Sequence, residues 1–446
     1  MNLEIKPSKL CEIVKGKILI LKKDDKIDFF VTDSRKLKKG EIFWALKGKN
    51  FDGNDFVKQA VSLGARGVIS SKKLEQKYIE KLDFFIYVKD TLKALHTLAE
   101  WHLKRFDIKV ISVTGSNGKT TTKEMIYAVL SSHKPTVYNP GNLNNEYGLP
   151  ISVLNAAKIH KYGVFEIGSS KKGEVGELAK IINPHMAVIT TIAPEHLEFF
   201  ETMENIYKTE TEVIKEIKKG GTIIINGDND YLKKLKKLKN VLSFGFEKEN
   251  DLVINFEKNY SLFQYRNKKY RFKLANHIKH NYLNAAAAFI VSALLKIPSS
   301  VFFKAIKRFK GVPLRMQIIK RKRSKIILDA YNANPQSMEY ALNEISGSKK
   351  YSLILGDMKE LGKYSAIYHK KLAEQILKLK PKNTFLIGPE IKTTYDFLKN
   401  KMKNVKYYSS TEDALSDLKK HIRENETTDF LIKASRSMRF EKFVEK

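Results

Sequence analysis

Apolar runs alternate with amphipathic stretches along most of this 446-residue chain. Between residues 109 and 312, short runs rich in β-branched residues are followed by stretches in which apolar residues recur every three or four positions. The runs predict strands and the stretches predict helices. Strands are expected at 109–113, 164–168, 187–192 and 222–226. Because strands that alternate with helices pair in parallel, this part of the chain predicts a mostly parallel sheet.

The same alternation returns from residue 314 to the C-terminus, whereas the first 86 residues carry short strands with turn-rich segments between them. Strands are expected at 326–330, 353–355, 385–387 and 430–433, and near the N-terminus at 17–21, 29–32, 42–46, 67–70 and 85–88. The chain is longer than one hydrophobic core supports. We therefore predict an α/β protein of three domains: a small N-terminal domain (1–86), a central domain (87–312) and a Rossmann-like, doubly wound C-terminal domain (313–446).

A glycine-containing loop follows the first strand of the central domain. Its sequence, TGSNGKTTTKEM, places Gly115 and Gly118 ahead of a helical pattern. Glycines let backbone N–H groups turn toward a polyphosphate, and the helix N-terminus adds the positive end of its dipole. Lys119 supplies a cation and Thr120 a hydroxyl for Mg²⁺, so the loop predicts a nucleoside triphosphate site in a P-loop ATPase-like domain. Val113 stands where the common form of the motif has its first glycine, and an ordinary glycine turn is the alternative.

Polar residues in loops and strands mark further candidate sites, because α/β proteins place ligands at strand ends. The loop 139–150, NPGNLNNEYGLP, offers amide donors and acceptors, although a plain surface turn has a similar composition. Glu166 lies inside an apolar strand, where either Mg²⁺ or a structural ion pair would compensate a buried carboxylate. His196 follows another strand, as a metal ligand or as a capping or packing residue. Asn281 stands at the start of a helix expected at 280–295, as a cap or as a contact to a base.

The composition adds a strong positive charge. The chain has 82 Lys and Arg against 49 Asp and Glu, a formal charge of +33. Such a charge can indicate nucleic-acid or membrane binding, but the lysines are spread along the whole chain without a basic groove of interleaved aromatic residues. The densest cluster, KRKRSK at 320–325, lies between two apolar runs and predicts an exposed hairpin. We therefore expect no nucleic-acid partner, and surfaces that would attract anionic nucleotides.

Cysteine usage and the lengths of the apolar runs indicate the compartment. The one cysteine, Cys11, permits no internal disulfide, as in proteins of the reducing cytosol. The first residues lack the apolar segment of a signal peptide. The most apolar stretch, 285–295, has about half of the roughly 20 residues that span a bilayer. The sequence therefore predicts a soluble, cytoplasmic protein with no membrane span.

Several stretches together resemble the Mur ligases, ATP-dependent enzymes that form amide bonds in cell-wall precursor synthesis. They are TGSNGKTTTKEM (114–125), GNLNNEYGLP (141–150), DAYNANPQSM (329–338), LGDMKELG (355–362), KASRSMRFEK (433–442), and TDSR (32–35) with FDGNDF (51–56). The resemblance covers essentially the whole chain. It implies ATP and Mg²⁺ as cofactors, a monomer, and the branch of the family that joins D-alanyl-D-alanine to UDP-N-acetylmuramoyl-tripeptide through an acyl phosphate.

The resemblance also assigns roles to residues. ATP would contact Gly115, Ser116, Asn117, Gly118, Lys119, Thr120, Thr121, Asn281, Arg315 and Asp329, with Asn281 at the adenine and the last two at the terminal phosphate and the ribose. One Mg²⁺ would bind Thr120 and Glu166, and a second Glu166 and His196. The UDP end would contact Ser34, Arg35 and Asp52, the muramoyl peptide Asn142, Asn144 and Asn145, and the dipeptide Asn332, Asn334 and Ser435. The implied catalytic residues are Lys119, Glu166, His196, Glu210 and Arg315.

Two positions depart from the family pattern. The helix after the His196 loop carries, in the family, a lysine that becomes carbamylated and bridges to Mg²⁺. Alignment places Glu210 at that position, with Lys208 two residues earlier. Because a glutamate already has the carboxylate that carbamylation would create, we interpret Glu210 as its substitute. Asn54 stands where the UDP-binding motif usually has histidine.

Three alternatives stay open on sequence alone. A sister ligase adding a single amino acid would share the phosphate loop, although DAYNANPQSM favours the branch that adds the dipeptide. A P-loop ATPase acting with nucleic acid would use the positive charge. A degenerate ligase would bind the substrates without turnover. The third residue of the accepted peptide is either diaminopimelate or lysine.

Overall fold

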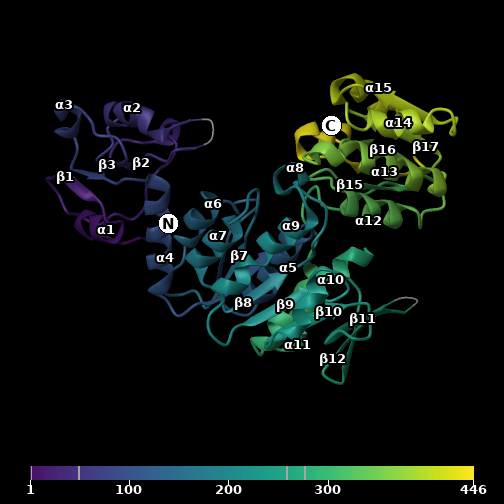
Figure 1. The fold of residues 1–446 in the computed structure, drawn as a ribbon, viewed down its shortest axis with the longest axis horizontal. Helices are drawn as coiled ribbons and strands as arrows, with labels where there is room; N and C mark the ends of the chain where they lie inside the picture. The colour runs from purple at the N-terminus through teal and green to yellow at the C-terminus, as the bar shows by residue number, and fades with distance from the viewer. Residues whose placement is uncertain (2, 49–50, 258–259, 276–277, 446) are drawn as a thin grey trace.

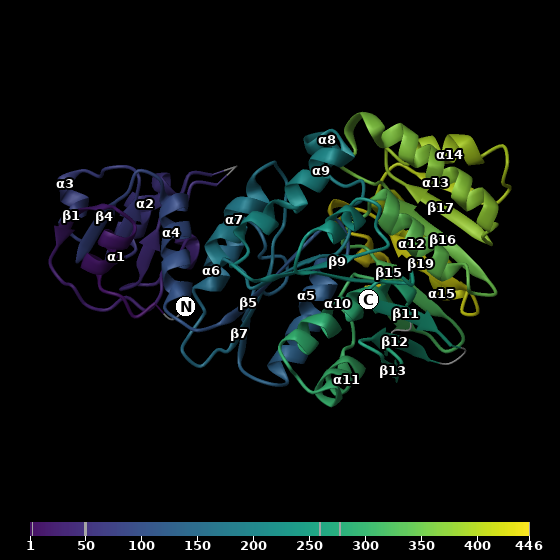
Figure 2. The same cartoon turned by 60° about the horizontal axis from the view of Figure 1, so that its bottom comes forward.

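The chain folds into three α/β units arranged in series, as a computed structural model shows (Figure 1). The structure describes residues 1, 3–48, 51–257, 260–275 and 278–445. Within these residues the strands form one sheet in each unit. The central unit lies between the other two, which stand at opposite ends of the molecule (Figures 1 and 2). The predicted three-part α/β architecture is confirmed.

The N-terminal unit has a small sheet in the order β1-β4-β3-β2, in which β1 is antiparallel to β4 and the other pairs are parallel. Its strands are β1 (Lys17–Leu21), β2 (Ile42–Trp44), β3 (Gly67–Ser70) and β4 (Phe84–Tyr87). Its helices are α1 (Pro7–Ile13), α2 (Val57–Ser62) and α3 (Gln76–Ile79), with 3₁₀ turns η1 (Ser34–Lys36) and η2 (Gly53–Phe56). Helix α4 (Thr91–Lys104) leads to the central unit, against which it packs.

The strand predicted at 29–32 is wrong. Within this described segment, pairing is limited to an isolated bridge between Val31 and Phe43. The preceding residue, Phe30, is buried against Trp44, with 4.6 Å between the ring centroids. Asp33 then caps η1 by accepting a hydrogen bond from the backbone N–H of Arg35. Phe30 packs into the core and the 3₁₀ turn η1 begins directly after Asp33. Too few residues remain between them to form a strand.

The central unit has a sheet in the order β13-β12-β11-β10-β9-β8-β5-β7-β6, parallel from β6 to β11. Its strands are β5 (Lys109–Thr114), β6 (Thr136–Tyr138), β7 (Tyr162–Glu166), β8 (Met186–Ile189), β9 (Thr222–Asn226), β10 (Val241–Gly245), β11 (Leu252–Phe256), β12 (Ser261–Tyr265) and β13 (Lys268–Phe272). Its helical elements are α5 (Lys119–Ser131), α6 (Gly148–Val153), α7 (Glu174–Ile182), α8 (Leu197–Phe200), α9 (Met203–Glu210), η3 (Glu212–Glu216), η4 (Leu232–Lys237), α10 (Lys279–Leu294) and α11 (Ser299–Arg308).

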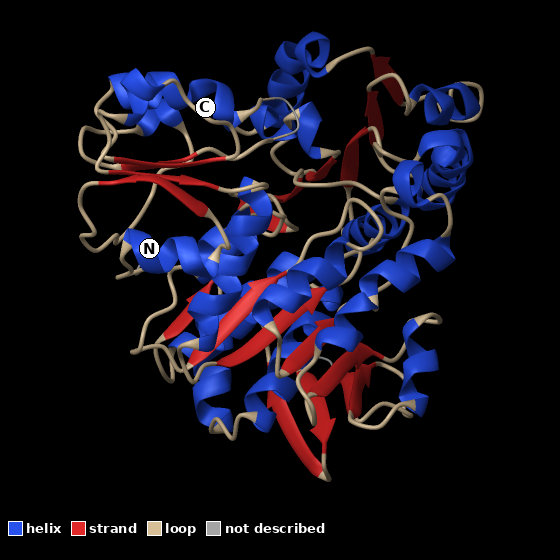
Figure 3. Cartoon of the chain, turned by 60° about the vertical axis from the view of Figure 1, so that its left-hand side comes forward, coloured by secondary structure: helices blue, strands red, loops and turns tan. Residues whose placement is uncertain are grey.

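Both faces of the central sheet are covered by helices (Figure 3). Ile223 and Ile225 of β9 belong to a core shared with α4, α6 and α7, whereas Ile224 between them belongs to a core shared with α5, α10 and α11. Successive residues of a strand point to opposite faces, so a strand buried on both faces is apolar throughout. This burial explains why β5, β7, β8 and β9 were recognisable as apolar runs, whereas β6 and β10 of the same parallel part were not predicted.

The antiparallel extension formed by β11, β12 and β13 was not predicted. Arg266 and Asn267 connect β12 to β13, and both have positive φ, as a two-residue hairpin turn of the primed type requires. Lysines and other polar residues fill the outward positions, so these strands lack the continuous apolar runs of the parallel ones. The alternation of buried and exposed side chains along β12 is the signal that could have identified them.

Helix α10 carries an alanine-rich face into the core. Ala285, Ala286, Ala287 and Ala288 are buried, and the helix packs on α5 and on β9, β10 and β11. The small side chains allow this helix to lie close to its neighbours. The helix predicted at 280–295 is thus present, one residue earlier, at Lys279–Leu294. In the part of the chain that the structure describes, no helix combines the length and the apolar character needed to cross a membrane.

The C-terminal unit has a sheet in the order β14-β15-β19-β16-β17-β18, parallel except for β14. Its strands are β14 (Gln317–Lys320), β15 (Lys325–Asp329), β16 (Tyr351–Gly356), β17 (Asn383–Ile387), β18 (Val405–Tyr408) and β19 (Asp429–Lys433). Its helical elements are α12 (Pro335–Ile345), η5 (Gly362–Tyr364), α13 (Ser365–Leu379), α14 (Lys392–Leu398), α15 (Thr411–Glu424), η6 (Arg436–Met438) and η7 (Phe440–Phe443). Strands β14 and β15 pair up to Lys320 and Lys325, and residues 321–324 form the turn between them, which confirms the predicted hairpin.

Candidate active site

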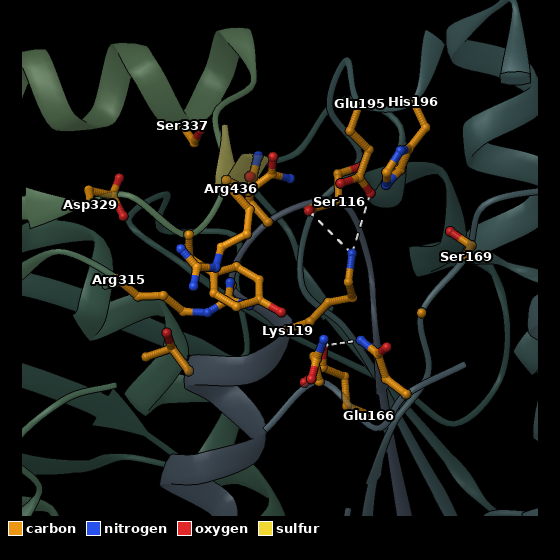
Figure 4. A pocket seen from close by; sticks show the side chains of 18 of the residues that line it. Ser116, Lys119, Glu166, Ser169, Glu195, His196, Arg315, Asp329, Ser337 and Arg436 are labelled. Atoms are coloured by element: carbon orange, nitrogen blue, oxygen red, sulfur yellow. Dashed lines mark hydrogen bonds and ion pairs between the residues drawn. The ribbon is translucent and has the colours of Figure 1, made fainter. Parts of the chain in front are cut away.

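A cavity of about 630 Å³ lies between the central and C-terminal units (Figure 4). The structure brings together in its wall most of the residues predicted from the motifs. From the central unit these are Ser116, Asn117, Gly118, Lys119, Thr121, Asn142, Asn144, Asn145, Glu166, His196 and Asn281. From the C-terminal unit they are Arg315, Asp329 and Asn332. A site that both units complete is suited to a reaction between molecules held on different domains.

The glycine loop forms one wall of the cavity, between β5 and α5. Gly115 and Gly118 both have positive φ, +118° and +83°. A Cβ at Gly115 would lie 2.5 Å from the Thr190 hydroxyl and 2.9 Å from the backbone nitrogen of Thr191. Gly118 is the N-cap of α5 and provides no side-chain cap, so the first N–H groups of the helix remain available to an anion. The local geometry is that of a phosphate-binding loop.

Lys119 reaches across this loop. Its ammonium donates to the carbonyl oxygen of Gly115 at 2.5 Å and to Glu195 at 3.4 Å. Burial alone would lower the pKa of Lys119, but the negative charges of Glu195, Glu210 and Glu166 outweigh that effect and raise the pKa. Burial raises the pKa of Glu195, against the opposing charge of Lys119. Lys119 is therefore held as a cation at the place where phosphate oxygens would arrive.

Glu166 provides a free carboxylate oxygen at the end of β7. Its Oε1 accepts from the Thr120 hydroxyl at 3.0 Å and from the Asn144 amide at 2.7 Å. Its Oε2 is buried and has no hydrogen-bond partner. An orphaned buried carboxylate oxygen beside a hydroxyl fits a cation such as Mg²⁺, which needs only one or two protein ligands beside water and phosphate oxygens. Thr120 itself is behind the cavity wall, in contact with Glu166.

His196 lies farther along the wall, at the N-cap of α8, with φ +48°. Its Nδ1 is 2.5 Å from the carboxylate of Glu360, which belongs to the C-terminal unit. Burial would lower the pKa of His196, but the hydrogen bond to Glu360 and the charge of Glu195 raise it. Among the described residues, no group of three or more His, Cys, Asp and Glu side chains is arranged around a common metal position. The predicted second Mg²⁺ site at Glu166 and His196 therefore stays a prediction.

Glu210 lies behind the phosphate loop rather than in the cavity wall. It is the last residue of α9 and is buried. One carboxylate oxygen accepts from the backbone N–H of Gly115 at 2.7 Å and from the Thr114 hydroxyl, and the other accepts from Ser169 at 2.8 Å. This arrangement lets Glu210 hold the start of the loop and contribute negative charge near Lys119.

The asparagine-rich loop lines the cavity beside Glu166. Asn144 contacts Glu166, as described above, and Asn142 lines the cavity from an exposed position. Asn145 also lines the cavity, but its side-chain oxygen accepts from the backbone nitrogens of Tyr147 and Gly148, at the start of α6. One of the three predicted amide groups is thus engaged in holding the backbone.

Arg315 and Asp329 belong to the first part of the C-terminal unit, Arg315 just before β14 and Asp329 at the end of β15. The Arg315 guanidinium carbon lies 3.8 Å from the centroid of the Tyr331 ring, and its Nε is buried without a hydrogen-bond partner. Asp329 accepts from the backbone N–H of Met316 at 3.0 Å and forms an ion pair with Lys433, directly opposite on β19. Lys433 also donates to the carbonyl oxygen of Asn332 at 2.9 Å.

The start of α10 meets the C-terminal unit across the same cavity. The His280 ring stacks on Tyr340 of α12 with 4.6 Å between centroids, and burial lowers the pKa of His280 to about 4. Asn284 accepts from the Thr122 hydroxyl at 3.0 Å and donates to Asn281 at 3.3 Å. Asn281 is thereby fixed to α5, beside two aromatic rings.

Other predicted residues lie outside the cavity wall. Asn334 caps α12 and exchanges two amide hydrogen bonds with Asn117, at 2.8 and 3.2 Å. Ser435 accepts from the backbone N–H of Lys359 at 3.0 Å. These contacts hold the C-terminal unit against the phosphate loop and hold the loop after β19 in place.

The predicted UDP-contact residues are in the N-terminal unit. Ser34 is buried and donates to Gln59, whereas Arg35 is exposed and forms an ion pair with Asp33. Asp52 caps η2 through the backbone N–H of Asn54 at 2.9 Å. The Asn54 side-chain oxygen accepts from Ser70 and from the backbone N–H of Ser71, so this departure from the family pattern fastens η2 to the end of β3.

Glu195, Tyr331, Tyr340 and Glu360 are site residues that sequence reasoning missed. Three of them lie within or beside the motifs described above, whereas Tyr340 lies two residues beyond DAYNANPQSM. Tyr331 and Glu360 belong to motifs quoted above, and Glu195 precedes His196. For Tyr331 a signal was available, because this aromatic residue lies between the predicted contacts Asp329 and Asn332.

Similarity to known proteins covers most of the chain. The model described as Mur ligase family, catalytic domain, matches residues 26–102, the Mur ligase middle domain matches 113–292, and the Mur ligase, glutamate ligase domain, matches 314–436. A relative from Bacillus subtilis (strain 168), named UDP-N-acetylmuramoyl-tripeptide--D-alanyl-D-alanine ligase, is 33% identical over 98% of this chain and 96% of its own length. A relative of the same name from Escherichia coli (strain K12) is 29% identical over 98% and 97%.

Solved structures agree over the same length. A crystal structure of MurF from Acinetobacter baumannii has a TM-score of 0.88 and 28% identity, and covers 100% of this chain and 99% of that one. The MurF ligase from Thermotoga maritima in complex with ADP has a TM-score of 0.82 and 30% identity, with coverage of 93% and 96%. The full-length matches agree with the resemblance drawn from the motifs. The chain belongs to the Mur ligase family.

Proposed function

We propose that the protein joins D-alanyl-D-alanine to UDP-N-acetylmuramoyl-tripeptide at the expense of ATP, giving UDP-N-acetylmuramoyl-pentapeptide, ADP and phosphate. The observation that carries the proposal is the composition of the cavity wall, in which Lys119 and Glu166 of the central unit face Arg315 and Asn332 of the C-terminal unit. Full-length similarity to relatives named for this reaction supports it. The reaction belongs to peptidoglycan precursor synthesis, which we place in the cytoplasm.

The chemistry begins with activation of a carboxylate. The terminal phosphoryl group of ATP passes to the tripeptide carboxylate, and the acyl phosphate is then attacked by the amine of D-alanyl-D-alanine with loss of phosphate. Lys119 and Arg315 lie where they would neutralise negative charge on the transferring group, which is the largest contribution a protein makes to phosphoryl transfer. Thr120 and Glu166 would hold Mg²⁺, which supplies further positive charge to the phosphate oxygens when bound.

The remaining residues bind the substrates and exclude water. Asn142 and Asn144 would contact the muramoyl peptide, and Asn332 the incoming dipeptide. The ion pair of His196 with Glu360 and the amide pair of Asn117 with Asn334 join the two units around the cavity. Contact between the units protects an acyl phosphate from hydrolysis.

We assign the three parts of the chain to three substrates. Residues 1–86 would bind the UDP end through Ser34, Arg35 and Asp52, residues 87–312 would bind ATP, and residues 313–446 would bind the dipeptide. The exposed guanidinium of Arg35 supports a role in binding an anion. We further assign to Glu210 the task of the carbamylated lysine in other family members, because it is a buried carboxylate next to the phosphate loop.

Phosphate release from ATP and Mg²⁺ tests the proposal. It is measured with UDP-N-acetylmuramoyl-tripeptide carrying diaminopimelate or lysine, with and without D-alanyl-D-alanine. Release that needs both substrates, with a product of the pentapeptide mass, is the expected result. Release with a single amino acid in place of the dipeptide would move the protein to another branch of the family. Release that ignores these substrates and responds to DNA or RNA would contradict the proposal.

A further inference from the structure

A buried lysine on the phosphate-loop helix has no part in the reaction described so far. Lys123 lies on α5, four residues after Lys119, and its side chain is 0% exposed. Removing an ammonium group from water carries a large desolvation cost unless partners compensate it. The partners of Lys123 therefore indicate what the residue is for.

Two of these partners are backbone carbonyl oxygens of the asparagine-rich loop. Lys123 donates to Asn139 at 2.7 Å and to Gly141 at 3.2 Å, and it forms an ion pair with Glu124 at 2.8 Å. Gly141 has φ +58°, and a Cβ placed there would meet nothing within 4 Å. Gly141 is exposed and has free space around its Cα. Among the described residues, the hydrogen bond from Lys123 is the contact that orients the Gly141 carbonyl group.

The start of the same loop is fastened to β7. The Asn139 amide donates to the carbonyl oxygen of Glu166 at 2.9 Å, and its side-chain oxygen accepts from the Glu166 backbone N–H at 2.8 Å. Asn144, farther along, donates to the Glu166 carboxylate at 2.7 Å. Between these two anchors lies Asn142, which faces the cavity. Lys123 adds an anchor from a different element, helix α5.

Helix α5 connects this anchor to the nucleotide site. Lys119 and Lys123 lie on successive turns of the helix, because they are four residues apart. The ammonium of Lys119 contacts the phosphate loop and Glu195, and that of Lys123 contacts the 139–145 loop. We propose that Lys123 is a positioning residue, which locks the 139–145 loop onto the phosphate-loop helix in the conformation that binds the muramoyl-peptide substrate. The identity of that substrate rests on the proposed function. A loop held in this way would align the carboxylate of the tripeptide substrate with the terminal phosphate of ATP, which Lys119 would contact.

Hydrogen–deuterium exchange tests the structural part without any substrate. Lys123→Met removes the ammonium and keeps an unbranched side chain, while Lys134→Met removes an exposed lysine just after α5 and is the control for net charge. We expect amide exchange in residues 139–145 to rise about tenfold in Lys123→Met, with no change in Lys134→Met. Unchanged exchange in this loop overturns the proposal, whether or not the parent protein makes pentapeptide.

Kinetics test the functional part. The KM for UDP-N-acetylmuramoyl-tripeptide should rise about tenfold in Lys123→Met, while the dissociation constant for ADP stays within about twofold of the parent value. An equal loss of ADP binding would indicate general damage to α5 and overturns the proposal. A parent protein that makes no pentapeptide contradicts the proposed function instead, and leaves the exchange result as the test of Lys123.

A second variant covers the case in which Lys123→Met does not fold. Gly141→Pro changes an exposed loop residue, and proline cannot adopt the φ of +58° that directs the Gly141 carbonyl to Lys123. The core around α5 is left intact. We expect a raised KM for the tripeptide substrate with unchanged ADP binding, and an unchanged KM overturns the proposal.

Discussion

Tyr331 places the guanidinium of Arg315 against its ring face, with 3.8 Å between the guanidinium carbon and the ring centroid. Because the Nε of Arg315 is buried without a hydrogen-bond partner, this ring is a principal contact that fixes the side chain. In Tyr331→Leu we expect kcat/KM to fall about tenfold, the equivalent of about 1.4 kcal/mol and within the range of desolvated cation–π contacts. Steady-state kinetics with ATP as the varied substrate measure the effect.

The matched control is Tyr331→Phe, which keeps the ring and removes the hydroxyl. Its kcat/KM should stay within about twofold of the parent value, because the attraction of a cation to a ring face does not need the hydroxyl. Equal losses in the Leu and Phe variants would contradict a role for the ring in positioning Arg315.

Glu210 gives a second prediction for a single residue. Glu210→Ala leaves the buried N–H of Gly115 without its acceptor, and an unsatisfied buried donor costs about 1–3 kcal/mol. We expect a lower free energy of unfolding by that amount in urea denaturation, and a loss of activity of about a hundredfold or more from the displaced phosphate loop. The parent should show the same activity with and without added bicarbonate, because its carboxylate needs no carbamylation.

Stimulation of the parent by bicarbonate would contradict this role, and carbamylation of Lys208 would show that the alignment at this helix is shifted. Lys208 is exposed and lies near Glu204 on α9, so its replacement by methionine serves as the control. That variant should keep the parent activity within about twofold, as surface substitutions away from a site usually do.

At the level of the elements, the phosphate loop depends on the φ of Gly115. In Gly115→Ala the new Cβ would meet the Thr190 hydroxyl at 2.5 Å and the Thr191 backbone at 2.9 Å, in a region of φ that alanine avoids. We expect the dissociation constant for ATP to rise at least tenfold and the free energy of unfolding to fall by about 1–3 kcal/mol. Calorimetric titration and thermal unfolding measure the two effects.

Gly40→Ala is the control for backbone strain alone. Gly40 has φ +85° in the N-terminal unit, and a Cβ there meets nothing within 4 Å. Its variant should lose about 1 kcal/mol of stability and keep the parent affinity for ATP. If both variants weaken ATP binding equally, the contact with Thr190 is not what limits substitution at Gly115.

Strands that are buried on both faces were the easiest to predict, although the partly exposed β1 was also predicted at its observed bounds. The strands β5, β7, β8 and β9 are mostly apolar runs that alternate with helical patterns, so their existence could be predicted from the local sequence. The strands β12 and β13 are partly exposed and carry charged residues, and β6 and β18 are short. Their pairing depends on neighbours that no local pattern specifies.

The candidate site shows the same division between local and long-range information. The loop from Gly115 to Thr121 and the carboxylate of Glu166 were indicated by their local sequence context, and Glu166 and most of the loop line the cavity. The amide pair of Asn117 with Asn334 joins residues 217 positions apart. The ion pair of His196 with Glu360 likewise depends on how the C-terminal unit sits against the central one. Such contacts require the arrangement of the units, which the sequence pattern does not contain.

At the scale of the whole molecule, the net charge of +33 belongs to no single element. Both ATP and the UDP-linked substrate are anionic, whereas D-alanyl-D-alanine is a zwitterion with no net charge. A positive molecule attracts the first two through a field that salt screens, with a Debye length of about 10 Å at 0.1 M ionic strength. The salt dependence of the KM values can therefore be compared between two anionic substrates and one substrate without net charge. The dipeptide is the internal control.

We expect the KM for ATP and for the UDP-linked substrate to rise several-fold between about 0.05 and 0.5 M NaCl, while the KM for D-alanyl-D-alanine changes less than about twofold. Initial rates with each substrate varied in turn give the three values. An equal rise for all three would indicate that salt acts on the protein rather than on attraction of the substrates. Stimulation of ATP hydrolysis by DNA or RNA would instead assign the charge to a nucleic-acid partner. Selective loss for the two anions would show that the lysine-rich surface serves the same cavity that Lys119 and Arg315 line.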